Sequence, residues 1–268
     1  IKDTNIYNMT NKIKYGVIGT GVMGQEHIEN INIIENAEVV AICDTNENSR
    51  NQTKSLVKDS TKFYNDLHEL ISNNIADAYI IATPNFTHIN ILEHILKTNK
   101  HLLIEKPLCT TTEDCKKFEL MSKNYSKIIW TGMEYRYMPP VQQLIKEVHN
   151  NVIGKIKMLS IREHRFPFLH KVDDWNRFAV NTGGTLVEKC CHFFDLMRLV
   201  IQSEPTKVYA SGNQDVNHLE EKYDGKTPDI IDNAFVIVDF ENGVRGMLDL
   251  CMFAENSEYQ EEIVAVGD

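Results

Sequence analysis

The sequence lacks the features of disulfide-rich, membrane-spanning and zinc-binding proteins. Its six cysteines are scattered over 268 residues, with no C-x-x-C pair and no Cys/His quartet, so neither a disulfide framework nor a zinc site is indicated. No apolar run reaches the roughly 18 residues of a membrane-spanning helix, and the first residues lack the basic-then-apolar order of a signal peptide. We therefore expect a cytosolic (cytoplasmic) protein with reduced thiols, no membrane partner and no bound metal.

Basic residues are also in the minority. The chain has 28 Lys and Arg against 38 Asp and Glu, which gives a formal net charge of −10 at pH 7. Such a surface disfavours nucleic acid as a partner, although an acidic protein can still hold a local basic pocket for a small ligand. The hydrophobic content of 42% is enough for a sizeable core, and the length favours two domains or one large one.

Short apolar segments alternate with helical patterns in the first half of the chain. The apolar segments are residues 13–18, 39–43, 78–82, 101–104 and 128–131. The helical patterns between them are residues 23–34, 46–58, 66–72, 87–98 and the segment that starts at 112. Apolar strands separated by helices are typical of an α/β fold, in which helices cover both faces of a parallel sheet. Right-handed crossovers make a doubly wound Rossmann sheet the natural topology.

The pattern changes after Tyr137-Met138-Pro139-Pro140. We expect helices at 141–148 and 186–200 and a long strand at 155–165. Further strands then follow one another, as in an antiparallel sheet: 207–212, 234–240, 244–253 and 261–266. This predicts an α/β Rossmann domain over residues 1–131 and an α+β domain over residues 132–268. The last residues are typical of a strand that enters a turn, so we expect the second domain to be incomplete at its C-terminal end.

A glycine-rich hexapeptide, Gly19-Thr20-Gly21-Val22-Met23-Gly24, follows the first strand and opens the first helix. In that context GxGxxG predicts a dinucleotide site. Gly19 would permit the tight turn, Gly21 would let a pyrophosphate approach the backbone, and Gly24 would let the helix pack on the strand. The helix N-terminus would supply N–H donors and partial positive charge. The alternative is a glycine turn without a ligand.

An acidic residue ends the second strand. Asp44 lies 25 residues after Gly19, where a carboxylate can accept hydrogen bonds from the adenosine ribose hydroxyls and repel a 2′-phosphate. NAD is therefore favoured over NADP as the cofactor, although Arg50 nearby weakens the distinction. The alternative is a solvated Asp at the end of a strand.

Four segments, taken in order, resemble the glucose-fructose oxidoreductase/inositol dehydrogenase/MocA-like (Gfo/Idh/MocA) family. They are residues 16–24, 82–88, Glu105-Lys106-Pro107 and 183–192, and the Glu-Lys-Pro motif is the most specific of them. The resemblance spans nearly the whole chain. It implies a Rossmann domain followed by a domain with a large, open, mostly antiparallel sheet, whose outer face often makes oligomer contacts. A homodimer or homotetramer through this sheet is expected. Members usually continue past the point where this chain stops.

The same resemblance implies roles for single residues. Thr83, Pro84, Asn85 and His88 would lie near the cofactor's ribose and nicotinamide, and Glu105 near the nicotinamide ribose. Lys106 would be the catalytic lysine and His192 the catalytic histidine. The family's Asp four residues before that histidine is Glu188 here. A helical i, i+4 spacing would place Glu188 and His192 on one helix face, where Glu188 could orient the imidazole.

These residues fit the oxidation of an alcohol. NAD supplies a hydride acceptor, His192 can serve as the base because imidazoles titrate near neutral pH, and Lys106 can stabilise charge on the same oxygen. Other polar and aromatic side chains suit a polyhydroxylated substrate such as a sugar or inositol. They are Tyr135, Arg136, Arg165, His170, Trp175 and Arg177.

Simpler interpretations remain open at this stage. Lys106 could be a surface lysine before a proline turn, His192 a core histidine, and Tyr135 and Trp175 core or interface residues. Glu220-Glu221 is expected to be a solvated loop face. Other functions with the same cofactor domain are a non-catalytic NAD- or sugar-sensing regulator, an NAD-dependent redox glycosidase, and a reductase of an imine or linear tetrapyrrole.

Overall fold

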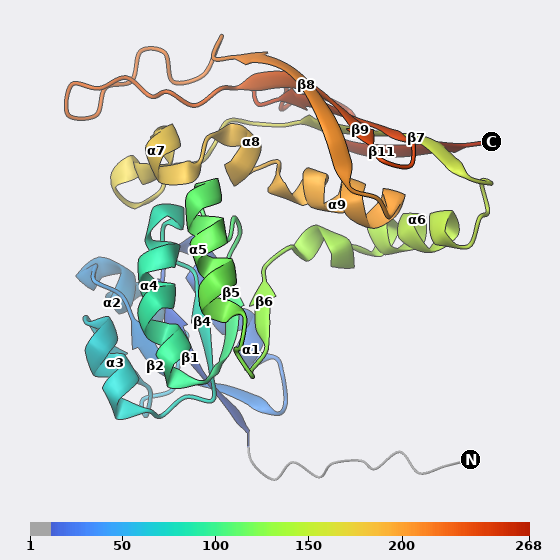
Figure 1. The fold of residues 1–268 in the computed structure, drawn as a ribbon. Coiled ribbons are helices and arrows are strands. Elements are labelled where there is room, and N and C mark those ends of the chain that lie inside the picture. Colours follow the sequence, from blue (N-terminus) through green and yellow to red (C-terminus); the bar gives the residue numbers. More distant parts are fainter. Residues whose placement is uncertain (1–11) are drawn as a thin grey trace, which may run out of the picture. The chain divides into compact units, whose positions relative to one another are not determined.

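A computed structural model describes residues 12–268 of the chain (Figure 1). The chain forms two compact units, and the division falls between Gly132 and Met133. Within the described residues, no helix combines the length and apolar character that crossing a bilayer requires. Each unit is built around its own sheet, and each sheet has its own apolar core.

The first unit is a doubly wound parallel sheet in the order β3-β2-β1-β4-β5-β6, which confirms the predicted Rossmann topology. Its strands are β1 (Ile13–Ile18), β2 (Ala37–Cys43), β3 (Lys62–Tyr64), β4 (Ala78–Ile81), β5 (His101–Ile104) and β6 (Ile129–Thr131). The sequence pattern did not predict β3. This strand has three residues and pairs only with β2 at the sheet edge, so its apolar pattern is too short to be recognised.

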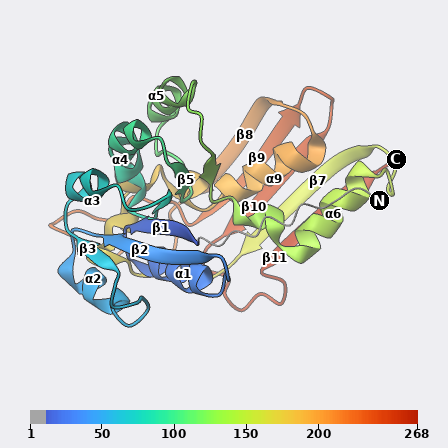
Figure 2. The ribbon, with the colours of Figure 1, turned by 90° about the horizontal axis from the view of Figure 1, so that it is seen from below.

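Helices cover both faces of this sheet (Figures 1 and 2). They are α1 (Val22–Asn32), α2 (Glu47–Thr53), α3 (Leu67–Asn73), α4 (His88–Ile95) and α5 (Thr112–Ser122), with 3₁₀ turns η1 (Asn85–Thr87) and η2 (Leu96–Thr98) around α4. Ile28 of α1 packs against Val17 and Val39 on one face. Leu70 of α3 and Leu92 of α4 belong to the core on the other face. Both faces of the strands are therefore apolar, as the uninterrupted apolar segments predict.

The second unit has a five-stranded sheet in the order β11-β7-β10-β9-β8. Its strands are β7 (Ile156–His164), β8 (Pro205–Asn213), β9 (Asn233–Phe240), β10 (Arg245–Cys251) and β11 (Glu261–Gly267). All neighbouring strands are antiparallel except β7 and β10, so the sheet is mixed but mostly antiparallel. The helices α6 (Pro139–His149) and α9 (Cys191–Ile201) pack on one of its faces through an apolar core (Figure 1).

One predicted helix is in fact two. Residues 186–200 were expected to form a single helix, but α8 (Thr185–Glu188) ends before α9 begins, shortly after α7 (Ala179–Thr182). Lys189 and Cys190 lie between α8 and α9, and Cys190, with ψ near −1°, departs from regular helical geometry. Lys189 is buried and pairs with Glu163 of β7, a contact that no helical periodicity can reveal. Glu188 therefore ends α8 while His192 belongs to α9, so the two residues do not lie on one continuous helix as predicted.

Candidate active-site residues

The glycine-rich loop has the geometry that a dinucleotide needs. A Cβ on Gly19 would lie 2.7 Å from the backbone of Ala82, and one on Gly24 would lie 2.0 Å from the Gly19 carbonyl oxygen, so neither position has room for a side chain. Gly21 differs, because nothing lies within 4 Å of the place where its Cβ would be. Gly21 caps the N-terminus of α1, so this open space borders the N–H groups of the first helical turn. A pyrophosphate fits such a place.

Asp44 holds this loop closed. Its Oδ2 accepts hydrogen bonds from the Thr20 backbone N–H, at 2.7 Å, and from the Thr20 hydroxyl, at 3.0 Å. Its Oδ1 accepts from the Asn46 N–H at 2.8 Å. The Arg50 guanidinium donates to the Asp44 backbone carbonyl. The sequence reading assigned Asp44 to the ribose only, whereas the structure also gives it a part in shaping the loop.

The segment after β4 is tied to the segment after β5 by His88. This ring is fully buried, and its two nitrogens lie 3.0 Å from the carbonyl oxygens of Thr83 and Pro107. Burial lowers the pKa of His88, against the opposing effect of these carbonyls. Asn85 is also buried, whereas Pro84 is half-buried. The ring of His88 therefore connects the segment of residues 83–85 with the segment that follows Lys106.

Glu105 is a buried carboxylate whose two oxygens bind different partners. Its Oε1 lies 2.7 Å from His27 Nε2, and its Oε2 accepts the Lys106 backbone N–H at 3.1 Å. Burial raises the pKa of Glu105, but the hydrogen bond and charge of His27, together with Lys106, outweigh it and leave that pKa below its usual value. The sequence reading missed His27. His27 could have been predicted from its position three residues after Gly24, which places both residues on the same side of α1.

Lys106 follows β5 and is half-buried. Because β1, β4 and β5 are parallel neighbours, their carboxyl ends meet at one edge of the sheet. The glycine-rich loop, residues 83–85 and Lys106 therefore share that edge. The strand order reverses between β1 and β4, which is where doubly wound sheets bind their ligands.

In the second unit, His192 is buried and stacks on Tyr135. The two rings are 4.3 Å apart and nearly parallel, with 9° between their planes. His192 Nε2 lies 3.4 Å from Oε1 of Glu134, which belongs with Tyr135 to the 3₁₀ turn η3 (Glu134–Tyr137). Glu188 is buried at the end of α8. Glu134 was not among the predicted residues, because nothing in the sequence links it to a position 58 residues later.

The hydroxyl of Tyr135 belongs to a polar cluster. It donates to Glu261 Oε1 at 2.7 Å and accepts from Lys189 Nζ at 2.6 Å. Burial raises the pKa of Tyr135. Lys189 also lies 2.9 Å from Glu163 Oε1, and Arg165 Nη1 lies 3.4 Å from the same oxygen. The structure thus brings together the predicted Tyr135, Arg165 and His192, with Lys189 and Glu163 as additions.

The other predicted substrate residues lie in separate groups. Arg136 forms an ion pair with Asp195 of α9. Trp175 is half-buried in the 3₁₀ segment η4 (Val172–Arg177), with the Lys171 ammonium 5.4 Å from its ring. His170 pairs with Asp174 at 2.6 Å.

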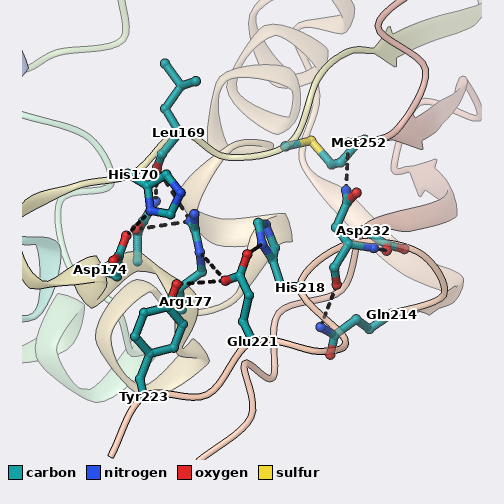
Figure 3. A network of polar contacts seen from close by, with 12 residues as sticks. Leu169, His170, Asp174, Arg177, Gln214, His218, Glu221, Tyr223, Asp232 and Met252 are labelled. Atoms are coloured by element: carbon teal, nitrogen blue, oxygen red, sulfur yellow. Dashed lines mark hydrogen bonds and ion pairs between the residues drawn. The ribbon is translucent and has the colours of Figure 1, made fainter.

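Arg177 is fully buried and is bound by the loop between β8 and β9 (Figure 3). Its Nε donates to Glu221 Oε2 at 3.1 Å, and Glu221 also binds His218 Nδ1 and the Tyr223 hydroxyl, each at 2.8 Å. Burial raises the pKa of Glu221, but these partners outweigh it and lower that pKa to about 2. The expectation that Glu220-Glu221 is only a solvated loop face is therefore wrong for Glu221. The described residues contain no cluster of three or more His, Cys, Asp or Glu arranged to hold a metal.

Comparison with known proteins agrees with these two units. Residues 13–133 match the Gfo/Idh/MocA oxidoreductase family with its NAD-binding Rossmann fold, and residues 145–264 match the family's C-terminal alpha/beta domain. The chain is 30% identical over 237 residues to myo-inositol 2-dehydrogenase of Thermotoga maritima, covering 88% of this chain and 68% of that enzyme.

Solved structures give the same result. A probable dehydrogenase from Thermotoga maritima has a TM-score of 0.78 and 30% identity, over 96% of this chain and 73% of that one. The fold is also shared, at a TM-score of 0.79 and 23% identity, with myo-inositol dehydrogenase from Lactobacillus casei in complex with NAD(H) and myo-inositol; the match covers 96% of this chain and 72% of that one. The chain therefore belongs to the Gfo/Idh/MocA family of oxidoreductases, and residues 13–133 are its NAD-binding Rossmann domain.

Proposed function

We propose that this protein is an NAD-dependent dehydrogenase that acts on a CH–OH group of an inositol, a sugar or a related polyol. The observation that carries the proposal is the position of Lys106 after β5, at the sheet edge that also holds the glycine-rich loop. Its backbone is fixed there by the buried Glu105. The name of the Thermotoga maritima relative supports the substrate class.

Residues of the first unit would bind the cofactor. Gly19, Thr20, Gly21, Val22, Met23 and Gly24 would carry the pyrophosphate at the N-terminus of α1. Asp44 would face the adenosine ribose, and its negative charge favours NAD over NADP. Thr83, Pro84, Asn85, Glu105 and Lys106 would lie along the nicotinamide half, with His88 holding their segments together.

Residues of both units would carry the chemistry. When bound, NAD supplies the acceptor for the hydride that leaves the substrate carbon. His192 would take the hydroxyl proton, and Lys106 would stabilise the negative charge that develops on the same oxygen. The carboxylate of Glu188 would orient the imidazole of His192. Tyr135, Arg136, Arg165 and Trp175 would contribute to substrate binding, although Arg136 would have to do so while paired with Asp195.

The test combines binding and turnover. NAD and NADP binding to the purified protein is measured by calorimetry, and a panel of inositols and sugars is screened for the absorbance of reduced cofactor. We expect NAD binding, turnover of at least one polyol, and a fall in turnover of about 10³-fold or more in Lys106→Ala with NAD still bound. Lys100→Ala, a change of the same type outside the predicted site, is the control. NAD binding without turnover of any polyol contradicts the dehydrogenase and favours a sensor or a redox glycosidase.

The outer face of the second sheet is proposed to join copies of the chain into a homodimer or homotetramer. Tyr209, Ile237, Met247 and Val264 lie in one register row across this face, together with Ser160, and all four are exposed. An exposed apolar row of this kind is typical of an interface. We expect Ile237→Lys to lower the molar mass measured by light scattering, whereas Leu120→Lys, at an exposed position on α5, should not. A monomeric unmodified protein contradicts this assembly.

A further inference from the structure

Lys189 is a buried cation in the turn between α8 and α9, three residues before His192. Its side chain is 8% exposed, and its ammonium lies 2.9 Å from Oε1 of Glu163, whose side chain is 1% exposed. Taking both charges out of water is costly, and a pair of apolar side chains at such positions is often more stable. The other oxygen of Glu163 is buried without a hydrogen-bond partner among residues 12–268, so the pair is not even fully satisfied. Stability alone therefore does not explain the pair.

The ammonium of Lys189 also holds the phenol of Tyr135. It donates to the Tyr135 hydroxyl at 2.6 Å and lies 4.9 Å from the centre of its ring. The same hydroxyl donates a hydrogen bond to Glu261 Oε1 at 2.7 Å. These contacts fix the hydroxyl end of the ring, while the ring itself packs against His192 and Phe193. A tyrosine bound at its hydroxyl and packed along its face has a defined position in the unit.

The same phenol ring is the surface on which His192 rests. The centres of the imidazole and phenol rings are 4.3 Å apart, their planes are 9° from parallel, and the imidazole is 2% exposed. Any tilt of Tyr135 would therefore tilt the imidazole with it. A proton acceptor must meet its hydroxyl within a few tenths of an ångström and a narrow range of angles, so such a tilt would slow the reaction.

We propose that Lys189, held in place by Glu163, is a positioning residue that fixes the ring of Tyr135 against His192 and thereby sets the orientation of the imidazole. The catalytic part of this inference rests on the proposed function, because it assumes that His192 acts on the substrate. The structural part does not. The charged and titratable groups that face the pair are Arg165 directly after β7, Glu261 on β11 and Tyr135 on η3.

The test uses a double variant that removes the cation and the anion of the buried pair together. Lys189→Met with Glu163→Gln removes both charges, so the fold is retained, whereas the hydroxyl of Tyr135 loses its donor. The ring protons of His192 are followed by NMR in the intact protein without NAD and assigned by their loss in His192→Gln. Stacking on the phenol face changes the chemical shifts of these protons, and we expect this change to be smaller in the double variant. Lys157→Met, at an exposed lysine of β7, is the control and should leave it unchanged.

Two further measurements separate positioning from general support of the fold. Tyr135→Phe keeps the ring but removes the hydroxyl, so it should reduce this change in chemical shift too, and adding it to the double variant should change little more. In the turnover assay, kcat should fall about 10- to 100-fold in the double variant, with the KM for NAD unchanged. Unaltered His192 signals in both Tyr135→Phe and the folded double variant would overturn the proposal. A protein with no polyol turnover contradicts the proposed function, while the NMR result still decides the role of Lys189.

Discussion

His27 Nε2 lies 2.7 Å from Glu105 Oε1, which connects the helix of the glycine-rich loop with the segment that carries Lys106. The two residues are 78 positions apart in the sequence. Glu105 uses its second oxygen to accept the Lys106 N–H. The position of the Lys106 backbone therefore depends on a side chain of α1, the helix that begins in the glycine-rich loop.

Replacing His27 tests this connection. His27→Leu removes the donor and leaves the Glu105 carboxylate buried without it, which should lower the free energy of unfolding by about 2 kcal/mol. Turnover should fall as well, because Lys106 loses a fixed support. His27→Gln retains an N–H donor and should recover part of both losses. The free energy of unfolding in urea and kcat are measured for both variants. Equal losses in His27→Leu and His27→Gln would contradict a role for the His27–Glu105 hydrogen bond.

Two glycines of the loop should respond in opposite ways to alanine. Gly24→Ala places a Cβ 2.0 Å from the Gly19 carbonyl oxygen, so the helix must move and the melting temperature should fall. Gly21→Ala meets no atom within 4 Å and keeps an ordinary φ of −64°, so the fold should be unaffected. The added methyl group would instead occupy the place of the pyrophosphate and lower NAD affinity at least about tenfold. Thermal unfolding and calorimetry check the pair. A stable Gly21→Ala that binds NAD normally would contradict this assignment of the cradle.

Asp44 should control both the loop and the choice of cofactor. Asp44→Asn removes the negative charge that would face a 2′-phosphate, so the ratio of NADP to NAD affinity should rise about tenfold. Asp44→Ala also removes the acceptor for Thr20 and should weaken both cofactors. Glu47→Gln, an equal change of charge at an exposed position of α2, is the control. Calorimetry with the two cofactors gives the ratio, and an unchanged ratio in Asp44→Asn would place the ribose elsewhere.

Glu221 makes stability depend on pH. Its pKa is lowered to about 2 in the folded protein from an ordinary value of 4.5, so its stabilising effect is complete above pH 4.5 and is lost as the pH falls toward 2. Glu221→Gln leaves Arg177 buried without its anion and should lower the free energy of unfolding at pH 7 by about 3 kcal/mol. Between pH 4.5 and pH 2, the free energy of unfolding of Glu221→Gln should fall less steeply than that of the unmodified protein.

The neighbouring carboxylate provides the control for that experiment. Glu220→Gln removes the same charge from the same loop, at an exposed position. Its urea midpoint should follow that of the unmodified protein from pH 7 down to pH 3. If Glu220→Gln and Glu221→Gln lose stability equally, the loop is not anchored through Arg177.

Much of the first unit could be predicted because its signals are local. Uninterrupted apolar strands, helical spacing and the glycines at 19, 21 and 24 express requirements of single segments, so they can be recognised before any contact is known. The run of consecutive strands after residue 155 likewise predicted an antiparallel second sheet, and the family resemblance agreed with it. The prediction failed at β3, which is too short to carry a pattern, and at residues 189 and 190, where a helical pattern continues through a break in the helix.

The sequence by itself thus determined the Rossmann sheet, the dinucleotide loop and the family. Only the tertiary structure decided which side chains meet: His27 with Glu105, Tyr135 with His192, and Lys189 with Glu163. Periodicity reports which face of an element is buried, but it says nothing about the partner on the other element. Those pairings depend on segments far apart in the chain, and a buried charge such as Lys189 finds its place only where a specific partner can offset the loss of water.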